Sequence, residues 1–508
     1  MSRIKIGWSK RDISTDMPVP MIGQAYLRIS EGVMDPIMAS CLVLDSGDDC
    51  VIFLSYDSEG CSQYVLEDVR NMLKEKCPEI PGDKITMNAT HAHTGAAIYP
   101  GNVGFSTGDP QDDLPCDGME ITSSEVYLDW LRGVLVDMIL EAWNGREEGG
   151  IAYGYGYAVV GHSRRVCYFD DVSLRDGNAN TKTNTYGVNG HSVMYGNTDD
   201  DKFSHYEAGA DHFENLLYTF DKDNKLTGAI INIPCPSQNS ESEWLLTSDY
   251  WHDVRKAIAE KYGDIFILPQ CAAGGDLSPR ILHYKKAQAR RFNLKYGIDT
   301  EAANRSRATE LCARKDIAER VTDAFTEVLD WAKKDIMTEV KIGHKTSTVM
   351  LSRWKITDEE YEYAKLGLAE ARAKGFVHTG DAKQDFIVNS TSVSNRNRCL
   401  KIIKRYETQE TDPKQAMELH VLRVGNIAFA TNGYELYMDF QHRIQARSPF
   451  EQTFIVQLAN QFESYICTDR ALEGKGYSAM IYSNQVSPEG GQELVEETLK
   501  QLKELYNE

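Results

Sequence analysis

The sequence has no uninterrupted apolar stretch approaching the roughly 18 residues of a membrane-spanning helix. It also lacks CxxC pairs, and its 11 cysteines, an odd number, are scattered along the chain. Such a set is typical of a reduced intracellular protein and not of a disulfide framework. The first residues show no apolar core of a signal peptide. We therefore expect a cytoplasmic protein that does not act at a membrane.

Basic residues are scarce relative to acidic ones. The chain has 55 Lys and Arg against 76 Asp and Glu, a formal net charge of −21. Nucleic acids and anionic membranes bind basic surfaces, so neither is expected as a partner. The hydrophobic share of 42% and the charged share of 26% are ordinary for a soluble globular protein. Because no repeat, low-complexity linker or domain boundary is evident, we interpret residues 1–508 as one domain; the sequence does not indicate an oligomeric state.

Apolar patterning predicts three strand–helix–strand units, hence an α/β fold of mixed β-sheets flanked by helices. The units cover strand 50–56, helix 62–76 and strand 84–90; strand 226–233, a helix from 248–249 and strand 264–268; and hairpin 420–423 with 427–430, a helix through 445 and strand 453–459. Further helices are predicted over 301–335, 356–374 and 489–506, and long polar loops over 105–125 and 171–205. Ligands gather outside the carboxyl ends of strands in such sheets, which is where the motifs below lie.

The segment Asn88-Ala-Thr-His-Ala-His-Thr-Gly95 places two imidazoles two residues apart at the end of a predicted strand. Residues i and i+2 share a face of an extended backbone, so His91 and His93 can point into one cavity. Neutral imidazole is a common zinc ligand, and the pair can begin a metal site. The alternative interpretation is that one His caps the loop and the other packs inside.

Ser278, in Gly275-Asp-Leu-Ser-Pro279, also has two interpretations. Ser before Pro is the signature of a helix N-cap followed by proline at the first helical position, with the helix over 279–291. A serine hydroxyl at a helix N-terminus also lies in a positive field that favours an oxyanion. The two glycines before Asp276 would let a substrate approach the backbone closely.

Taken together, the motifs resemble those of the neutral/alkaline ceramidase family over most of the chain. The resemblance rests on an N-terminal signature ending in Gly32-Val-Met-Asp-Pro36, on His91-Ala-His-Thr-Gly95, on Gly275–Pro279, on Glu435 in Asn-Gly-Tyr-Glu, and on Tyr465 and Tyr477, twelve residues apart. The fold it implies is the family's catalytic domain, without the C-terminal β-sandwich.

The resemblance implies a Zn²⁺ ion held by His91, Glu435 and Tyr465, with Ser278 beside it. It also implies hydrolysis of an amide. His93 would be a proton shuttle or a partner of a ligand, and Tyr477 would hydrogen-bond the developing oxyanion. Catalytic roles are thus expected for Ser278, His93, Tyr477 and Asp276, with either Ser278 or a zinc-bound water as the nucleophile. Arg164 and Arg165 resemble the family's substrate-positioning arginine, and Asp57 would orient a ligand or cap a helix.

Two departures from the family pattern bear on the site. Cys235, in Cys-Pro-Ser-Gln, stands where the family has a second zinc histidine. It is either a thiolate ligand or a buried small residue. Arg280 replaces the usual Asn and adds a cation where the substrate should bind. The loop histidines His162, His191 and His212 could supply a missing ligand or contact the substrate, although each is more simply a surface or packed residue.

These observations predict a zinc-dependent hydrolase that cleaves a C–N bond in a small, polar, soluble substrate instead of membrane ceramide. Arg164, Arg165 and Arg280 favour an anionic or sugar-like substrate, since arginine suits planar anions. Two alternatives remain. One is a carbohydrate-active hydrolase or lyase that uses the same metal pocket. The other is a metal-free binding protein, motivated by the missing second histidine.

Overall fold

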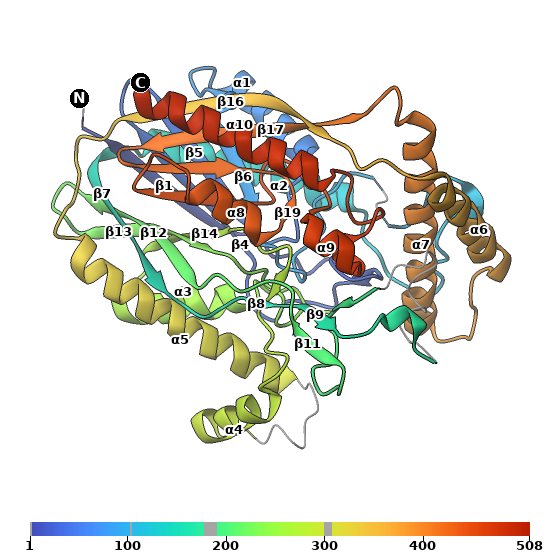
Figure 1. Cartoon of the computed structure of the whole chain (residues 1–508). Coiled ribbons are helices and arrows are strands. Elements are labelled where there is room, and N and C mark those ends of the chain that lie inside the picture. The colour runs from blue at the N-terminus through green and yellow to red at the C-terminus, as the bar shows by residue number, and fades with distance from the viewer. Residues whose placement is uncertain (1–2, 102–103, 177–189, 299–306) are drawn as a thin grey trace.

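Two β-sheets packed face to face form the centre of the molecule (Figure 1). The computed structural model describes residues 3–101, 104–176, 190–298 and 307–508. The larger sheet has the strand order β14-β13-β12-β7-β1-β4-β5-β6 and the smaller β16-β17-β18-β20. In chain order these strands are β1 (Lys5–Asp12), β4 (Met38–Asp45), β5 (Cys50–Tyr56), β6 (Ile85–Ala89), β7 (Glu147–Tyr157), β12 (Phe213–Asp221), β13 (Leu226–Ile233), β14 (Phe266–Cys271), β16 (Ile342–Ser352), β17 (Lys414–Val424), β18 (Ile427–Thr431) and β20 (Gln452–Val456).

Side chains alternate between the two faces of each strand, and both faces of the larger sheet are apolar. Phe53 on β5 points inward and packs at a tilt against Phe429 of the smaller sheet, with ring centroids 5.0 Å apart. The neighbouring Ile52 and Leu54 point outward to α1 (Gln63–Lys76) and α2 (Ser124–Asn144). On the same outer face, β12 and β13 are covered by α3 (Tyr250–Tyr262) and α5 (Arg307–Ala332).

The outer face of the smaller sheet is covered by α8 (Met438–Gln445) and α10 (Pro488–Asn507). The layers are therefore helix, sheet, sheet, helix, and the predicted α/β class with flanking helices is confirmed. No helix within the described residues is both long and apolar enough to cross a membrane.

A helical hairpin between β16 and β17 projects from the sheets at the right of Figure 1. It consists of α6 (Asp358–Lys374), which begins at a capping box of Thr357 and Glu360, and α7 (Ala382–Thr408). Phe386 and Val393 on one face of α7 pack with Leu27 and Ile29 of the N-terminal segment. This contact places α7 opposite the ends of the central strands.

The strands and helices that apolar patterning predicts are present, with two corrections, whereas α2, α7 and the strands β4, β7, β12 and β16 were not predicted. The helix predicted over 279–291 does not begin at Pro279: residues Leu277–Ser278 form a short strand, β15, and α4 runs over Lys285–Tyr296. The predicted loop 171–205 contains β10 (Ser192–Met194) and β11 (Phe203–Tyr206), which pair with β9 (Arg165–Tyr168); residues 177–189 of that loop lie outside the described part.

Candidate active site

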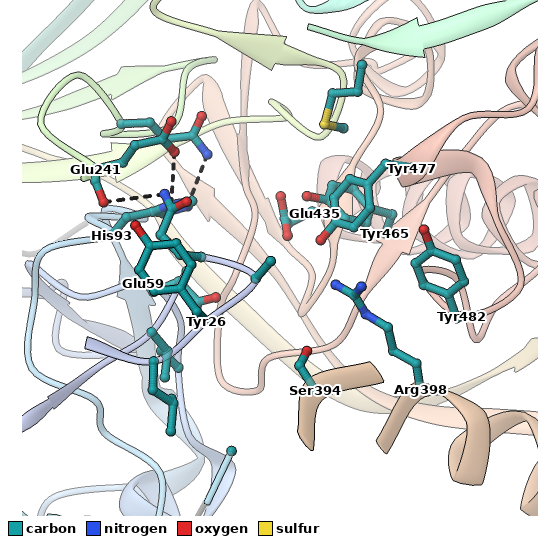
Figure 2. A pocket seen from close by; sticks show the side chains of 18 of the residues that line it. Tyr26, Glu59, His93, Glu241, Ser394, Arg398, Glu435, Tyr465, Tyr477 and Tyr482 are labelled. Atoms are coloured by element: carbon teal, nitrogen blue, oxygen red, sulfur yellow. Dashed lines mark hydrogen bonds and ion pairs between the residues drawn. The ribbon is translucent and has the colours of Figure 1, made fainter. Parts of the chain in front are cut away.

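A cavity of about 930 Å³ lies between the strand ends and α7. The sequence-predicted residues in its wall are His91, His93, Arg164, Arg280, Glu435, Tyr465 and Tyr477. Figure 2 shows His93, Glu241 and Glu59 on one side and the Glu435, Tyr465 and Tyr477 group on the other, with Arg398 of α7 reaching toward that group. Ser278, Asp276, Cys235 and Arg165 are not part of this wall.

The two histidines follow β6 and point into the cavity together. β6 ends at Ala89, and His91 adopts φ +59°, so a turn and not strand alternation brings the rings together. The rings are perpendicular, with centroids 4.8 Å apart and Nε2 atoms 3.4 Å apart. Asp57 supports the turn because it accepts a hydrogen bond from Thr90 at 3.1 Å and pairs with Arg255 at 2.7 Å.

Each histidine is oriented through its Nδ1 atom. His91 Nδ1 lies 2.5 Å from the Glu59 carbonyl oxygen, and His93 Nδ1 lies 3.3 Å from Glu241 Oε2. The Nδ1 contact of His91 leaves its Nε2 directed at the cavity and at Glu435, the arrangement found where imidazole serves as a metal ligand. Gly23, with φ +101°, makes room for the His93 ring: a Cβ there would lie 2.6 Å from Cγ of the ring.

Glu435 and Tyr465 stand side by side because β19 (Glu435–Leu436) and β21 (Tyr465–Ile466) pair in parallel, with these two residues in register. Glu435 Oε2 lies 3.3 Å from His91 Nε2. Arg164 lies 3.6 Å from the same oxygen and donates to the Tyr465 hydroxyl at 3.2 Å and to the Gly275 carbonyl at 2.8 Å. Residues from four distant segments therefore meet at one point.

The charges of this group influence one another. Burial alone would raise the pKa of Glu435, but His91 and Arg164 hold that pKa below its usual value. Burial alone would lower the pKa of His91, and Glu435 raises it above its usual value. Burial and the neighbouring Glu435 raise the pKa of Tyr465 well above its usual value. The lowered pKa of Glu435 favours its ionised carboxylate, which stabilises a positive charge beside it.

The opposite wall carries a second polar group, which the sequence did not reveal. Glu241 pairs with Arg280 and approaches His93, while the Gln238 side chain lies 3.0 Å from His93 Nε2. Burial alone would raise the pKa of Glu241, but His93 and Arg280 hold it at about 2. Burial lowers the pKa of His93 to about 4. Burial raises the pKa of Glu59, a third acid in the wall, to about 7.

Cys235 lies behind the cavity, fully buried beside Cys271, whose thiol donates to its carbonyl oxygen at 3.5 Å. Burial, together with Cys271, raises the pKa of the Cys235 thiol well above its usual value. A buried protonated thiol is typical of a packed cysteine. The structure therefore does not bring Cys235 together with His91 and Glu435 in the cavity wall.

Ser278 and Asp276 are also buried. Ser278 forms a bridge with His162, and its hydroxyl accepts the Arg280 amide at 3.3 Å, so it caps no helix. Asp276 accepts the amide of Met438 at 3.1 Å, and burial raises its pKa to about 6. Their contacts are those of the loop that supports Arg164 and Arg280, and their catalytic roles stay predictions.

Arg165 points away from the cavity. It is fully buried and forms a two-pronged ion pair with Glu207, with distances of 2.9 and 2.6 Å. It also donates to the carbonyl oxygens of Lys475 at 2.7 Å and Ala471 at 3.2 Å. Arg165 thus holds the chain segment just before Tyr477. The loop histidines His162, His191 and His212 do not line the cavity either.

Among the described residues, no group of three or more His, Cys, Asp or Glu side chains is arranged to hold a metal ion. The side chains that converge here are His91, Glu435 and Tyr465, and the phenol of Tyr465 is a donor outside those four residue types. His91 Nε2 and Glu435 Oε2 are 3.3 Å apart, which matches the separation of about 3.3 Å between two ligands of a tetrahedral zinc with bonds of about 2.0–2.1 Å. Glu435 Oε2 is buried and accepts no well-directed hydrogen bond from the described residues. The donors present therefore fit zinc.

The comparisons with known proteins concern the fold. No protein-family model matches the chain, and no curated protein matches its sequence significantly. The neutral ceramidase from Pseudomonas aeruginosa has a similar structure, with a TM-score of 0.65 at 15% identity, over 99% of this chain and 75% of that one. A ceramidase complexed with C2 gives a TM-score of 0.63 at 14% identity, over 100% of this chain and 76% of that one. The chain therefore has the neutral-ceramidase fold.

Proposed function

We propose that the chain is a zinc-dependent hydrolase that cleaves an amide bond in a small, polar substrate. The observation that carries this proposal is the convergence of His91, Glu435 and Tyr465 in one cavity of a ceramidase fold. The cavity wall is rich in charged groups, among them Glu59, Glu241, Arg398 and Lys401. A charged wall suits a polar substrate better than two lipid chains, because burying unpaired polar groups against hydrocarbon is costly.

His91, Glu435 and Tyr465 would hold the zinc ion. Bound zinc supplies Lewis-acid polarisation of a carbonyl and lowers the pKa of water. Arg164 orients the Tyr465 hydroxyl through its 3.2 Å hydrogen bond. His93 lies beside Glu241, and its Nε2 atom accepts a hydrogen bond from the Gln238 amide. When water replaces that amide, Nε2 can accept a proton from the attacking water and return it to the leaving amine.

Tyr477 completes the wall beside these donors. Its ring lies 5.9 Å from that of Tyr465 at a steep angle, and 39% of the residue is exposed. Its hydroxyl forms no hydrogen bond within the described residues and can donate one to the substrate oxygen that gains charge during attack. The cavity would thus bind the amide between the Tyr477 hydroxyl and the His93 ring.

To test this proposal, purified, zinc-loaded protein is incubated with matched pairs of substrates. N-Acetylglucosamine and its phenyl β-glycoside report amide and glycosidic cleavage in one molecule, and N-acetylglycine and N-acetylethanolamine extend the amide series. We expect release of acetate and free amine without release of phenol. Loss of a residue that hydrogen-bonds to a metal ligand typically lowers activity about 10–100-fold. The Glu435→Gln variant should lose more activity than that, because Glu435 would bind the zinc itself. Phenol release without amine release would favour the carbohydrate-active alternative and contradict the proposal.

A further inference from the structure

Arg164, Arg165 and Arg280, from which the sequence predicted an anionic substrate, are all paired with other groups of the protein. Arg164 is bound to Tyr465 and lies beside Glu435. Arg165 is buried on Glu207, and Arg280 is paired with Glu241. Each therefore has its charge balanced within the protein. An anionic ligand would have to be recognised by other cations.

Two such cations line the cavity from α7. Arg398 and Lys401 are one helical turn apart, on the same face as Ser394 and Asn397, because residues three, four and seven apart along a helix share one side. Figure 2 shows Arg398 and Ser394 directed from α7 toward the Glu435, Tyr465 and Tyr477 group. This face of α7 is the wall opposite the histidines.

Arg398 is held in place by aromatic rings. Its guanidinium lies 5.0 Å from the ring centroid of Tyr482 and 5.7 Å from that of Tyr477, and it donates to the Asn395 side chain at 3.3 Å. Stacking on rings fixes a guanidinium while leaving its remaining N–H groups free to bind a planar anion. None of the carboxylates in the described residues forms an ion pair with Arg398.

Lys401 has an exposed side chain that forms no ion pair or hydrogen bond within the described part of the chain. The carboxylate whose charge acts on it most is that of Glu463. Glu463 lies outside the cavity wall and accepts hydrogen bonds from Gln415, Gln461 and Gln485 instead. The α7 wall therefore carries two cations without a bound counter-charge among the described residues.

We propose that this face of α7 is an oxyanion-binding subsite, in which Arg398 and Lys401, with Ser394 and Asn397 beside them, bind a carboxylate or sulfonate of the ligand. The inference rests on the proposed function for its substrate class: short N-acyl amino acids and their sulfonate analogues. Tyr477 contacts both Tyr465 and Arg398, so a single ring separates the amide position from the subsite. Only a short linker between amide and anion would fit both.

Binding to metal-free protein tests the subsite separately from catalysis. Calorimetry on the EDTA-treated full chain would compare N-acetylglycine and N-acetyltaurine with the neutral N-acetylglycinamide. We expect at least tenfold tighter binding of the two anions. Since a hydrogen bond to a charged group contributes about 1.5–3 kcal/mol, removing one cation should weaken anion binding roughly 10- to 100-fold. Binding of the neutral amide should change little.

The variants are Lys401→Met, Arg398→Met and, as a matched control, Lys404→Met. Lys404 is an exposed cation on the same helix that does not line the cavity, so its loss should leave anion binding unchanged. Lys401→Met keeps the test valid if Arg398→Met disturbs Tyr477 and Tyr482. Equal binding of anion and amide, failure to bind the anions, or an effect of Lys404→Met equal to that of Lys401→Met would each overturn the subsite. Failure of amide cleavage with anion preference intact would refute only the proposed hydrolase.

Discussion

Replacing Arg165 by Met should destabilise the protein strongly while leaving the cavity cations in place. Arg165 is fully buried, and its substitution would leave Glu207 buried without its cation. Breaking a buried ion pair by removing one partner typically costs about 3–5 kcal/mol. The hydrogen bonds from Arg165 to Lys475 and Ala471 would be lost as well, so the loss should fall in the upper half of that range.

Urea unfolding followed by tryptophan fluorescence would measure the change. With a slope of at least about 3 kcal/mol/M for a chain of this size, a loss of about 4 kcal/mol corresponds to a fall of at most roughly 1.3 M in the midpoint. The double variant Arg165→Met/Glu207→Leu should recover much of this loss, because replacing both partners by apolar groups removes the unpaired charge. Arg447→Met is the matched control: its ion pair with Glu496 is exposed, so its midpoint should stay close to wild type.

Two results would refute this account of Arg165. One is an unchanged midpoint in Arg165→Met. The other is normal stability combined with a selective loss of anion binding, which would mean that Arg165 reaches the substrate as the sequence first suggested. A normal midpoint in the double variant with impaired ligand binding would instead point to the Tyr477 segment as the element that Arg165 positions.

Two further predictions concern the histidine pocket and acid stability. Gly23→Ala should weaken binding of N-acetylglycine, because the new Cβ would lie 2.6 Å from the His93 ring at φ +101°; Gly108→Ala, at φ +91° with no atom within 4 Å, carries similar backbone strain without the clash and should bind normally. Calorimetry measures N-acetylglycine binding to both variants, and an equal loss of affinity in the two would contradict the role of Gly23. Burial alone would raise the pKa of Glu418, but His420 and Arg70 hold it at about 2. Its folded-state pKa is thus below its usual value of 4.5, so it contributes stability above pH 4.5, about 2–3 kcal/mol, that is lost as the pH falls toward 2. In Glu418→Gln the urea midpoint should fall less between pH 5 and pH 3 than in wild type. A fall as large as in wild type would contradict this contribution of Glu418 to stability.

The central strands could be predicted from sequence because they are nearly all apolar. Strands 50–56 and 226–233 have the predicted bounds, since both of their faces are buried between layers. α7 was missed because Asn, Ser and Thr are frequent in it and weaken the helical signal. Its buried positions Phe386, Asn389, Val393, Arg396 and Cys399 do recur every three or four residues and could have revealed it.

The site was predicted in part, and the reason lies in sequence distance. The motif residues His91, Glu435 and Tyr465 converge in the cavity, and the resemblance to a known family had grouped them. Glu241 and Lys401 carry no motif, and only the folded chain brings them to the same cavity. The direction of a side chain could not be anticipated either: Arg164 and Arg165 are adjacent in sequence and both buried, yet only Arg164 lines the cavity.

The metal content of purified protein tests the central claim most directly. Wild-type protein, dialysed against zinc and then against buffer, should retain about one zinc per chain. His91→Ala and Glu435→Gln should lose it, whereas Cys235→Ala should keep it, because Cys235 lies outside the cavity wall. Wild-type protein without zinc, or loss of zinc in Cys235→Ala but not in His91→Ala, would contradict the account.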